Sequence, residues 1–106
     1  MRFGANLTSR MRGVAALALM ALGSGCGPAL YTADIHSAER TLQTARDENA
    51  RWYAPYEYYF AEAHLQQSER LAAESDYEDA IRYAKVAEDF GTRALDITRR
   101  KRTTEP

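Results

Sequence analysis

The feature that most constrains this chain is the near absence of glycine and proline after Pro28. Only Pro55, Gly91 and the terminal Pro106 follow it. These two residue types are the strongest local interrupters of regular backbone, and residues 32–100 also lack the alternating apolar pattern, bounded by turn residues, that strands show. The sequence therefore predicts an all-α fold built from a few long helices.

The first predicted helix spans residues 32–53 and carries a heptad seam. Its seam residues recur at alternating spacings of three and four: Ile35, Ala38, Leu42, Ala45, Asn49 and Trp52. Alanine at alternate positions lets a partner helix approach closely, and Asn49 would fix the register of that pairing. Pro55 ends the helix, because a proline inside it would remove a hydrogen bond and clash with a carbonyl one turn earlier.

The second predicted helix spans residues 55–74, with Pro55 at the first position that proline favours. Its apolar stripe contains Tyr58, Ala61, Leu65, Ser68 and Ala72, broadened by Phe60 and Leu71. Trp52 and Tyr58 are in register with the first and second stripes. We therefore expect both rings to pack inward at the corner between the two helices.

The third predicted helix spans residues 76–100. Ser75 and Glu78 fit a capping box, in which each side chain binds the backbone N–H of the other residue. Two apolar stripes follow: Tyr77, Ala80, Ala84, Ala87, Gly91 and Ala94 on one, and Tyr83, Val86, Phe90 and Ile97 on the other. Such a wide apolar arc predicts a helix that packs against both others or against a partner chain.

These patterns together predict an antiparallel three-helix bundle or helical hairpin, coiled-coil-like, with alanine-rich seams. The helical domain covers residues 32–100, after a short linker at residues 26–31. Residues 101–106 are expected to form a polar tail. The basic run from Arg99 to Arg102 suits the C-terminal end of a helix.

The N-terminal segment has the features of an export signal. Arg2, Arg10 and Arg12 give it a basic start, and an uncharged apolar run follows from Val14 to Leu22. Nine helical residues cover only about 13 Å, well short of the roughly 20 residues that span a bilayer. We therefore interpret residues 1–25 as a signal peptide that is absent from the mature protein.

The end of that segment, Leu22-Gly23-Ser24-Gly25-Cys26, resembles the lipobox of bacterial lipoproteins. In that motif a small residue precedes a cysteine that is lipidated and becomes the mature N-terminus. Gly23 stands where the motif prefers leucine, and Gly23 with Gly25 would equally suit ordinary signal cleavage. Cys26 is the only cysteine, and an unpaired thiol in an exported protein needs a modification or an intermolecular disulfide. We predict that Cys26 is lipidated and anchors the protein in a membrane.

The position after the cysteine bears on the location of the protein. Gly27 is not the aspartate that the lipoprotein resemblance associates with retention in the inner membrane. The resemblance therefore implies an exported protein in the outer membrane, facing the periplasm.

The charge distribution narrows the choice of partners. Without the signal segment the chain carries 11 basic against 15 acidic residues, and residues 31–97 carry 7 against 14. Because binding to nucleic acid needs a basic face, this acidic body argues against such a partner.

Residues 75–87, SDYEDAIRYAKVA, resemble the second helix of a tetratricopeptide repeat, with Ala80 and Ala87 at its packing positions. No second copy recurs at the 34-residue period of that repeat, and a single unit cannot form a solenoid. The resemblance therefore implies a helical hairpin only.

A closer resemblance is to short bacterial lipoproteins of unknown function. Their hairpin pattern is Ala-Pro-x-x-Tyr-Tyr-x-Ala-x-x-x-Leu followed by Asp-Tyr-x-x-Ala-x-x-x-Ala. The matching residues here are Ala54-Pro55, Tyr58-Tyr59, Ala61, Leu65, Asp76-Tyr77, Ala80 and Ala84. The likeness covers roughly residues 33–98, and its specificity lies in these motif positions. Some relatives carry an outer-membrane-protein-A-type domain after the hairpin.

No pattern in the sequence indicates catalytic chemistry. His36 and His64 are the only histidines, lie on different predicted helices and belong to no HExxH or Cys/His metal pattern. A glycine-rich phosphate loop and a nucleophile elbow are also lacking. We therefore expect a protein that is not an enzyme and uses no metal or other cofactor.

Two hypotheses for the function remain. In the first, the protein is a lipid-anchored interaction or scaffold module that receives a protein partner or a second copy through its helical seams. In the second, the aromatic cluster around Pro55 binds a small molecule or a cell-wall glycan by ring stacking. The candidate interaction surface consists of Tyr53, Tyr56, Tyr59, Tyr83 and Phe90.

Overall fold

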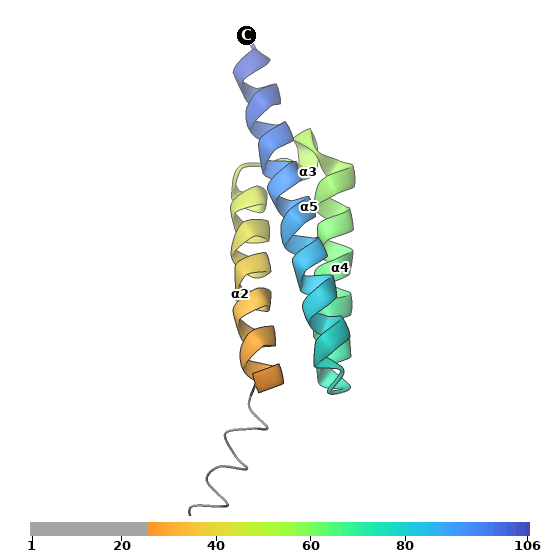
Figure 1. Ribbon diagram of the computed structural model, residues 1–106. Coiled ribbons are helices and arrows are strands. Elements are labelled where there is room, and N and C mark those ends of the chain that lie inside the picture. Colours follow the sequence, from red (N-terminus) through yellow and green to blue (C-terminus); the bar gives the residue numbers. More distant parts are fainter. Residues whose placement is uncertain (1–25) are drawn as a thin grey trace, which may run out of the picture.

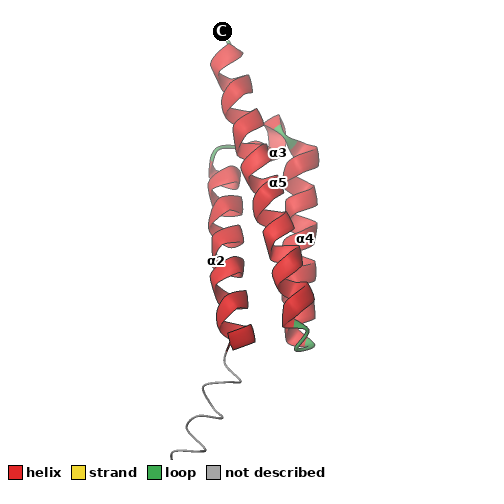
Figure 2. Cartoon of the chain, viewed as in Figure 1, coloured by secondary structure: helices red, strands yellow, loops and turns green. Residues whose placement is uncertain are grey.

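The computed structural model describes residues 26–106, which fold into helices joined by short turns (Figure 2). The helices are α2 (Cys26–Asp47), α3 (Ala50–Tyr53), α4 (Pro55–Ala73) and α5 (Tyr77–Thr104). No strand occurs in this described part of the chain, and the predicted all-α fold is confirmed. The predicted signal peptide and its lipobox positions lie outside the described residues: 1–25, including Leu22, Gly23, Ser24 and Gly25.

Helix α5 lies between the other two long helices. α2 and α5 run in the same direction and α4 runs against both, as Figure 1 shows. α5 packs extensively against α2 and against α4, whereas α2 and α4 contact each other much less. The wide apolar arc of the third predicted helix thus faces both neighbours, as expected. None of the helices described between Cys26 and Thr104 is both long and apolar enough to cross a membrane.

The contact between α2 and α5 is built from small residues. The seam residues Ile35, Ala38, Leu42 and Ala45 are buried, as are Ala87, Gly91 and Ala94 of α5. A Cβ atom on Gly91 would lie 2.9 Å from the Thr41 Cγ2 atom, so glycine permits a close approach that a side chain would force Thr41 to give up. The seam predicted on the first helix therefore has its partner inside the same chain.

The first helix differs from the prediction at both ends. α2 begins at Cys26 rather than at residue 32, so the expected linker is helical, and α2 ends at Asp47. Asn49 has a left-handed backbone with a φ of 68°, which asparagine tolerates better than most residues. Asn49 is therefore the break between α2 and α3, and the expected role in fixing the seam register is wrong.

The break at Asn49 turns Trp52 outward. Ala50 and Ala54 occupy the buried positions of the corner, and Trp52 is 76% exposed. The prediction that Trp52 packs inward is wrong, because the heptad register that continues in the sequence is reset at Asn49. Tyr58, the other ring expected inside the corner, is fully buried as predicted.

The turn between α4 and α5 uses different caps from those predicted. The N–H groups of Ser75 and Asp76 bind the carbonyls of Ala72 and Leu71, each at 2.9 Å, and Ser75 has a φ of 64°. This is a Schellman motif, which closes the C-terminal end of α4. Asp76 rather than Ser75 is the N-cap of α5, where its carboxylate accepts a hydrogen bond from the Asp79 amide. The predicted capping box is therefore misplaced by one residue.

Helix α5 continues to Thr104, so most of the expected polar tail is helical and projects beyond α3 (Figure 1). Its basic end contacts the α2–α3 turn and the C-terminal end of α3. Arg99 donates two hydrogen bonds to the Glu48 carboxylate, at 3.0 and 2.7 Å, and Lys101 Nζ donates to the Tyr53 carbonyl at 2.6 Å. The bonds from Arg99 lower the pKa of Glu48. The basic run thus stabilises the corner in addition to suiting the helix dipole.

Two hydroxyl side chains are fully buried in the core. Ser68 on α4 donates a 2.6 Å hydrogen bond to the Ala80 carbonyl and so links α4 to α5. The Thr98 hydroxyl on α5 has no hydrogen-bond partner among the described residues. Ser68 therefore compensates its burial through a bond, whereas Thr98 does not.

Candidate functional site

Six side chains form a half-exposed strip along the junction of α4 and α5, which we name the aromatic face. α4 contributes Tyr56, Phe60 and His64, and α5 contributes Tyr83, Val86 and Phe90. The residues from each helix recur every three or four positions, so each set follows one side of its helix. Tyr56 is 67% exposed and Val86 37%, and the other four are partly buried.

The rings of the aromatic face form a continuous row in which each ring contacts the next. Phe60 occupies the centre, with its ring centroid 4.1 Å from that of Phe90 across the helix junction and 4.1 Å from that of His64 on its own helix. The Tyr56 ring lies 5.9 Å from Phe60 on the other side. The Tyr56–Phe60 separation is typical of attractive aromatic pairs, and the two pairs at 4.1 Å are in closer contact. The strip is therefore an ordered surface.

His64 lies between two rings rather than among metal ligands. Its ring stacks on Phe60 and, at 5.4 Å, on Tyr83 of α5. Its Nδ1 atom lies 2.9 Å from the Phe60 carbonyl oxygen, which can only accept, so Nδ1 bears the proton. His36, the other histidine, lies on α2 and pairs with Glu39 at 3.5 Å. Within residues 26–106, no three His, Cys, Asp or Glu side chains converge as ligands for a metal ion.

Two shallow pockets open on the aromatic face. The first has a volume of about 270 Å³ and is lined by His64, Arg82, Tyr83 and Val86. The second has a volume of about 280 Å³ and is lined by Tyr56, Glu57, Phe90, Arg93, Asp96, Ile97 and Arg100. Each pocket combines apolar walls with at least one guanidinium group. The surface is thus suited to apolar side chains flanked by charge.

Arginine side chains border the aromatic face on the α5 side. The Arg93 guanidinium lies 4.6 Å from the centroid of the Phe90 ring, within the range of a cation–π contact. Arg93 also pairs with Asp89 at 2.8 Å, and Arg82 pairs with Asp79. Both arginine side chains remain more than half exposed, at 57% and 69%. They are therefore available to a molecule that covers the face.

The five residues of the predicted interaction surface separate into two groups. Tyr56, Tyr83 and Phe90 meet on the aromatic face. Tyr53 lies elsewhere, because its hydroxyl donates a 2.8 Å hydrogen bond to the Glu105 carboxylate. Tyr59 lies with its ring edge against Tyr58, at 5.2 Å, and is 52% exposed away from the α4–α5 junction.

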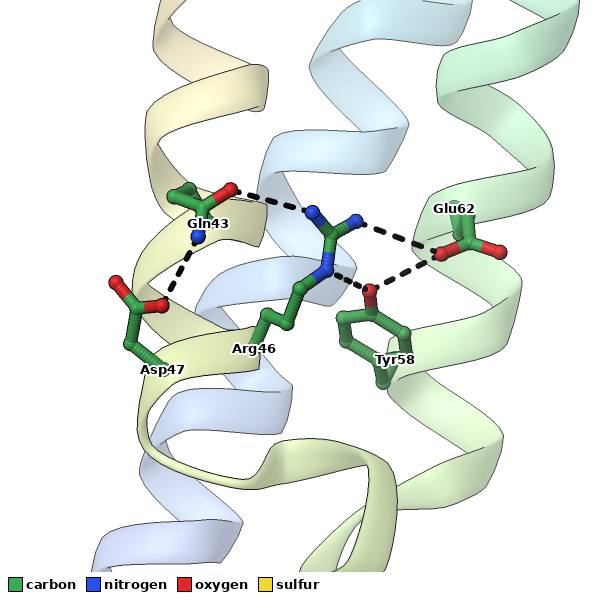
Figure 3. Close-up of polar contacts among 5 residues, drawn as sticks. All are labelled: Gln43, Arg46, Asp47, Tyr58 and Glu62. Carbon is green, nitrogen blue, oxygen red and sulfur yellow. Dashed lines mark hydrogen bonds and ion pairs between the residues drawn. The ribbon is translucent and has the colours of Figure 1, made fainter.

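The side of α4 that faces α2 is closed by a polar network (Figure 3). The buried Tyr58 hydroxyl accepts a 3.0 Å hydrogen bond from Arg46 Nε and donates one of 3.0 Å to Glu62. Arg46 also pairs with Glu62 at 3.8 Å and donates to Gln43, so α2 and α4 are tied together across α5. The network buries the Tyr58 ring and links the two helices, which is a structural role.

Several members of the site were missed because their role depends on two helices meeting. Phe60 and Val86 were assigned only to apolar stripes, and His64 was weighed only as a metal ligand. The sequence does hold a signal, since Tyr56, Phe60 and His64 recur at steps of four, off the buried stripe of their helix. A second aromatic stripe outside the buried stripe of a helix indicates aromatic side chains that remain at the surface.

The comparisons with known proteins identify a family and no individual relative. Residues 33–105 match the family model described as a domain of unknown function, DUF4398. No curated protein and no solved structure matches the chain. The matched segment includes all of α3, α4 and α5 and most of α2, so the aromatic face lies wholly inside it. The chain therefore belongs to this family of helical domains of unknown function.

Proposed function

We propose that the protein is a non-catalytic, lipid-anchored module of the bacterial cell envelope that binds a protein partner through the aromatic face. The observation that carries the proposal is the row of contacting rings from Tyr56 through Phe60 and His64 to Tyr83, left half-exposed beside two open pockets. Contiguous apolar surface rimmed by charge is a common mark of interaction sites, and aromatic residues supply much of the binding energy there.

The anchor in this proposal rests on the export signal and on the lipobox-like sequence that ends at Cys26. Cys26 is also the first residue of α2, a helix of 22 residues that extends about 33 Å. Tyr56 belongs to the end of the bundle away from Cys26 (Figure 1). With an acyl chain on Cys26, the Tyr56 end of the aromatic face would lie in the periplasm at a distance from the lipid, and the Tyr83 end would lie nearer to it. Because Gly27, and not aspartate, follows the cysteine, we propose that the protein is located in the outer membrane.

The anchor is tested by fractionation of cells that express Cys26→Ala. We expect the variant to move from the outer-membrane fraction to the soluble periplasmic fraction, because the acyl chains supply the membrane affinity. A variant that stays in the membrane fraction would contradict the anchor.

The binding face is tested by placing a photocrosslinking amino acid at Val86, which is exposed in the first pocket. The matched control carries the same amino acid at Thr44, an exposed position of α2. We expect irradiation of whole cells to give one discrete crosslinked protein from position 86 and none from position 44. Equal products at the two positions, or none at either, would contradict binding through the aromatic face.

A second candidate function, binding of a cell-wall glycan, is favoured by one observation. In the second pocket the exposed Tyr56 ring stands beside carboxylates of Glu57 and Asp96 and guanidinium groups of Arg93 and Arg100. Glycan sites combine an aromatic platform with convergent polar groups of this kind. Co-sedimentation with purified cell walls tests it, with several-fold weaker retention expected for Tyr56→Ala. Retention that is unchanged by this variant would exclude the pocket as a glycan site.

A further inference from the structure

The first two turns of α2 carry an exposed surface that belongs neither to the core nor to the aromatic face. Residues 27–33, GPALYTA, contain no charged side chain, and the first charge of α2 is that of Asp34. We name residues 27–33 the uncharged segment. Leu30 is 61% exposed. The other exposed residues of the segment are Pro28, Ala29, Thr32 and Ala33.

The uncharged segment packs against the start of α5. A Cβ atom on Gly27 would lie 3.6 Å from the Tyr77 side chain, an ordinary van der Waals contact, and the rings of Tyr31 and Tyr77 lie 6.0 Å apart. α2 and α5 therefore begin at the same end of the bundle, where the α4–α5 turn also lies (Figure 1). Because α2 is helical from Cys26 onward, an acyl group attached to Cys26 would be held at this end.

The length of the uncharged segment matches the depth of a lipid headgroup layer. Its seven residues extend about 10 Å at about 1.5 Å per helical residue. The headgroup layer on each side of a bilayer is roughly 5–8 Å deep. With acyl chains on Cys26 in the hydrocarbon, the segment would pass through the headgroups, and Asp34 would lie at their outer edge.

The remaining side chains at this end have a net negative charge. The α4–α5 turn and the first turn of α5 hold four carboxylates: Glu74, Asp76, Glu78 and Asp79. Arg70 pairs with Glu74 at 2.8 Å, and Arg82 pairs with Asp79. Two arginines therefore accompany four carboxylates. An anionic lipid surface would repel this end of the bundle, whereas headgroups that bear an ammonium group would not.

We propose that the uncharged segment is a second membrane contact, which enters the headgroup layer of a zwitterionic membrane and holds the bundle upright on it. The acyl chains supply the affinity and keep the segment at the lipid surface, where the apolar surface of Leu30 is removed from water. This inference rests on the lipid anchor of the proposed function and adds the orientation of the bundle. It places the α3–α4 corner at the end farthest from the membrane.

The opposite end of the bundle is the competing membrane contact. Its exposed Trp52 and the basic run at residues 99–102 are residue types that lipid surfaces attract. Two of the basic side chains, those of Arg99 and Lys101, already bind the α2–α3 turn and the end of α3. α2 also places this end about 33 Å from Cys26. The uncharged segment adjoins the anchor, so the geometry favours it over the basic end.

The test measures how close a single tryptophan lies to the lipid. Trp52 is the only tryptophan of the chain, so Trp52→Phe provides a background for Leu30→Trp. Thr44→Trp in the same background is the matched control, because Thr44 is an exposed position of α2 that lies 14 residues farther from Cys26. The lipidated proteins are reconstituted in vesicles of phosphatidylcholine and phosphatidylethanolamine with acyl chains brominated near the headgroup. Circular dichroism verifies that each variant is folded.

We expect the brominated lipid to quench the fluorescence from position 30 at least about twofold, and that from position 44 and from Trp52 of the unaltered protein less than about 1.2-fold. Replacement of half of the lipid by phosphatidylglycerol should weaken the quenching at position 30, because the four carboxylates are repelled. Quenching at position 30 that stays equal or becomes stronger on the anionic vesicles would overturn the zwitterionic contact.

The outcomes separate this inference from the proposed function. A lipidated protein that floats with the vesicles but shows no quenching at position 30 would overturn the contact and leave the anchor intact. Quenching of Trp52 in place of position 30 would show that the basic end lies on the membrane, and would overturn the contact as well. If the protein carries no acyl chain or does not float with the vesicles, the anchor itself fails and the inference fails with it.

Discussion

Helix α5 meets its two neighbours in different ways. Toward α2 it presents Gly91, so close to Thr41 that even a Cβ atom there would force the threonine side chain to shift. Phe90, the residue before it, points about 100° away around the helix and meets Phe60 of α4. Small residues close the contact between α5 and α2. The contact between α5 and α4 has aromatic rings along its edge that the two helices leave partly exposed. Two adjacent residues of α5 thus have different roles: Gly91 packs the core against α2, and Phe90 forms part of the aromatic face.

Overpacking the closed contact should have the largest effect on stability. Gly91→Leu places a branched side chain against Thr41 and Leu42, and we expect it to lower the free energy of unfolding by about 3 kcal/mol. Urea denaturation measures the change, and Thr92→Leu at the next, exposed position is the control. A loss below about 1 kcal/mol at Gly91 would show that the α2–α5 contact is looser than the structure indicates.

Removing one hydroxyl from the closed side should have an intermediate effect. Tyr58→Phe deletes the hydrogen bonds from Arg46 and to Glu62 while keeping the buried ring (Figure 3). We expect a loss of about 1.5 kcal/mol, since bonds to charged groups are among the stronger ones but these partners are partly exposed to water. Tyr59→Phe is the matched control on the neighbouring residue, and an equal loss in both variants would contradict the network.

Truncating the aromatic face should have a smaller effect on stability. Tyr56 contributes little to the core because most of its surface is exposed. We therefore expect Tyr56→Ala to change the free energy of unfolding by less than about 0.5 kcal/mol, measured by urea denaturation. A loss as large as that of Tyr58→Phe would show that the exposed ring supports the fold, and the contrast between the two sides would be lost.

The smallest expected effect is a difference in pH response between the two ends of the bundle. The hydrogen bonds from Arg99 lower the pKa of Glu48 below its ordinary value of 4.5, so their stabilisation is present above that value and is lost as the pH falls through the lowered pKa. Burial raises the pKa of Glu69 above its ordinary value of 4.5, and the charge of Glu39 raises it further. The contribution of Glu69 to the stability of the fold is therefore present below pH 4.5 and is lost as the pH rises through the raised pKa.

Melting temperatures between pH 3 and 7 distinguish the two carboxyl groups. Glu48→Gln should remove part of the loss of stability in acid, and Glu69→Gln should raise the melting temperature toward neutral pH. Two variants with the same pH profile as the unaltered protein would contradict both assignments.

Periodicity was enough to predict the closed side from the sequence. Ile35, Ala38, Leu42 and Ala45 follow the heptad spacing, and the structure buries all of them. The same pattern failed at Trp52, because it continues through Asn49 although the backbone turns there. Neither glycine nor proline marks that turn. Asparagine is the other residue that commonly adopts a left-handed conformation at a helix end, and it was the available signal.

The aromatic face could be predicted only in part. Tyr56, Tyr83 and Phe90 were named as surface residues, but the pairing of His64 with Tyr83 depends on how α4 and α5 are aligned. That alignment follows from the turn at Ser75, where the Schellman motif places Asp76 at the start of α5. The apolar stripes of the two helices do not show how the helices are aligned, so the contact of His64 with Tyr83 could not be predicted from them.

Hydroxyl-radical footprinting of the protein in native envelopes and in purified form tests directly whether a partner covers the aromatic face. If the aromatic face holds a partner, Tyr56, Tyr83 and Phe90 will be protected from oxidation in the envelope and reactive after purification. Trp52 and Tyr59, which are exposed elsewhere, serve as internal controls and should react equally in both samples. Equal reactivity of all five residues in the two samples, or protection confined to Trp52 and Tyr59, would contradict the account.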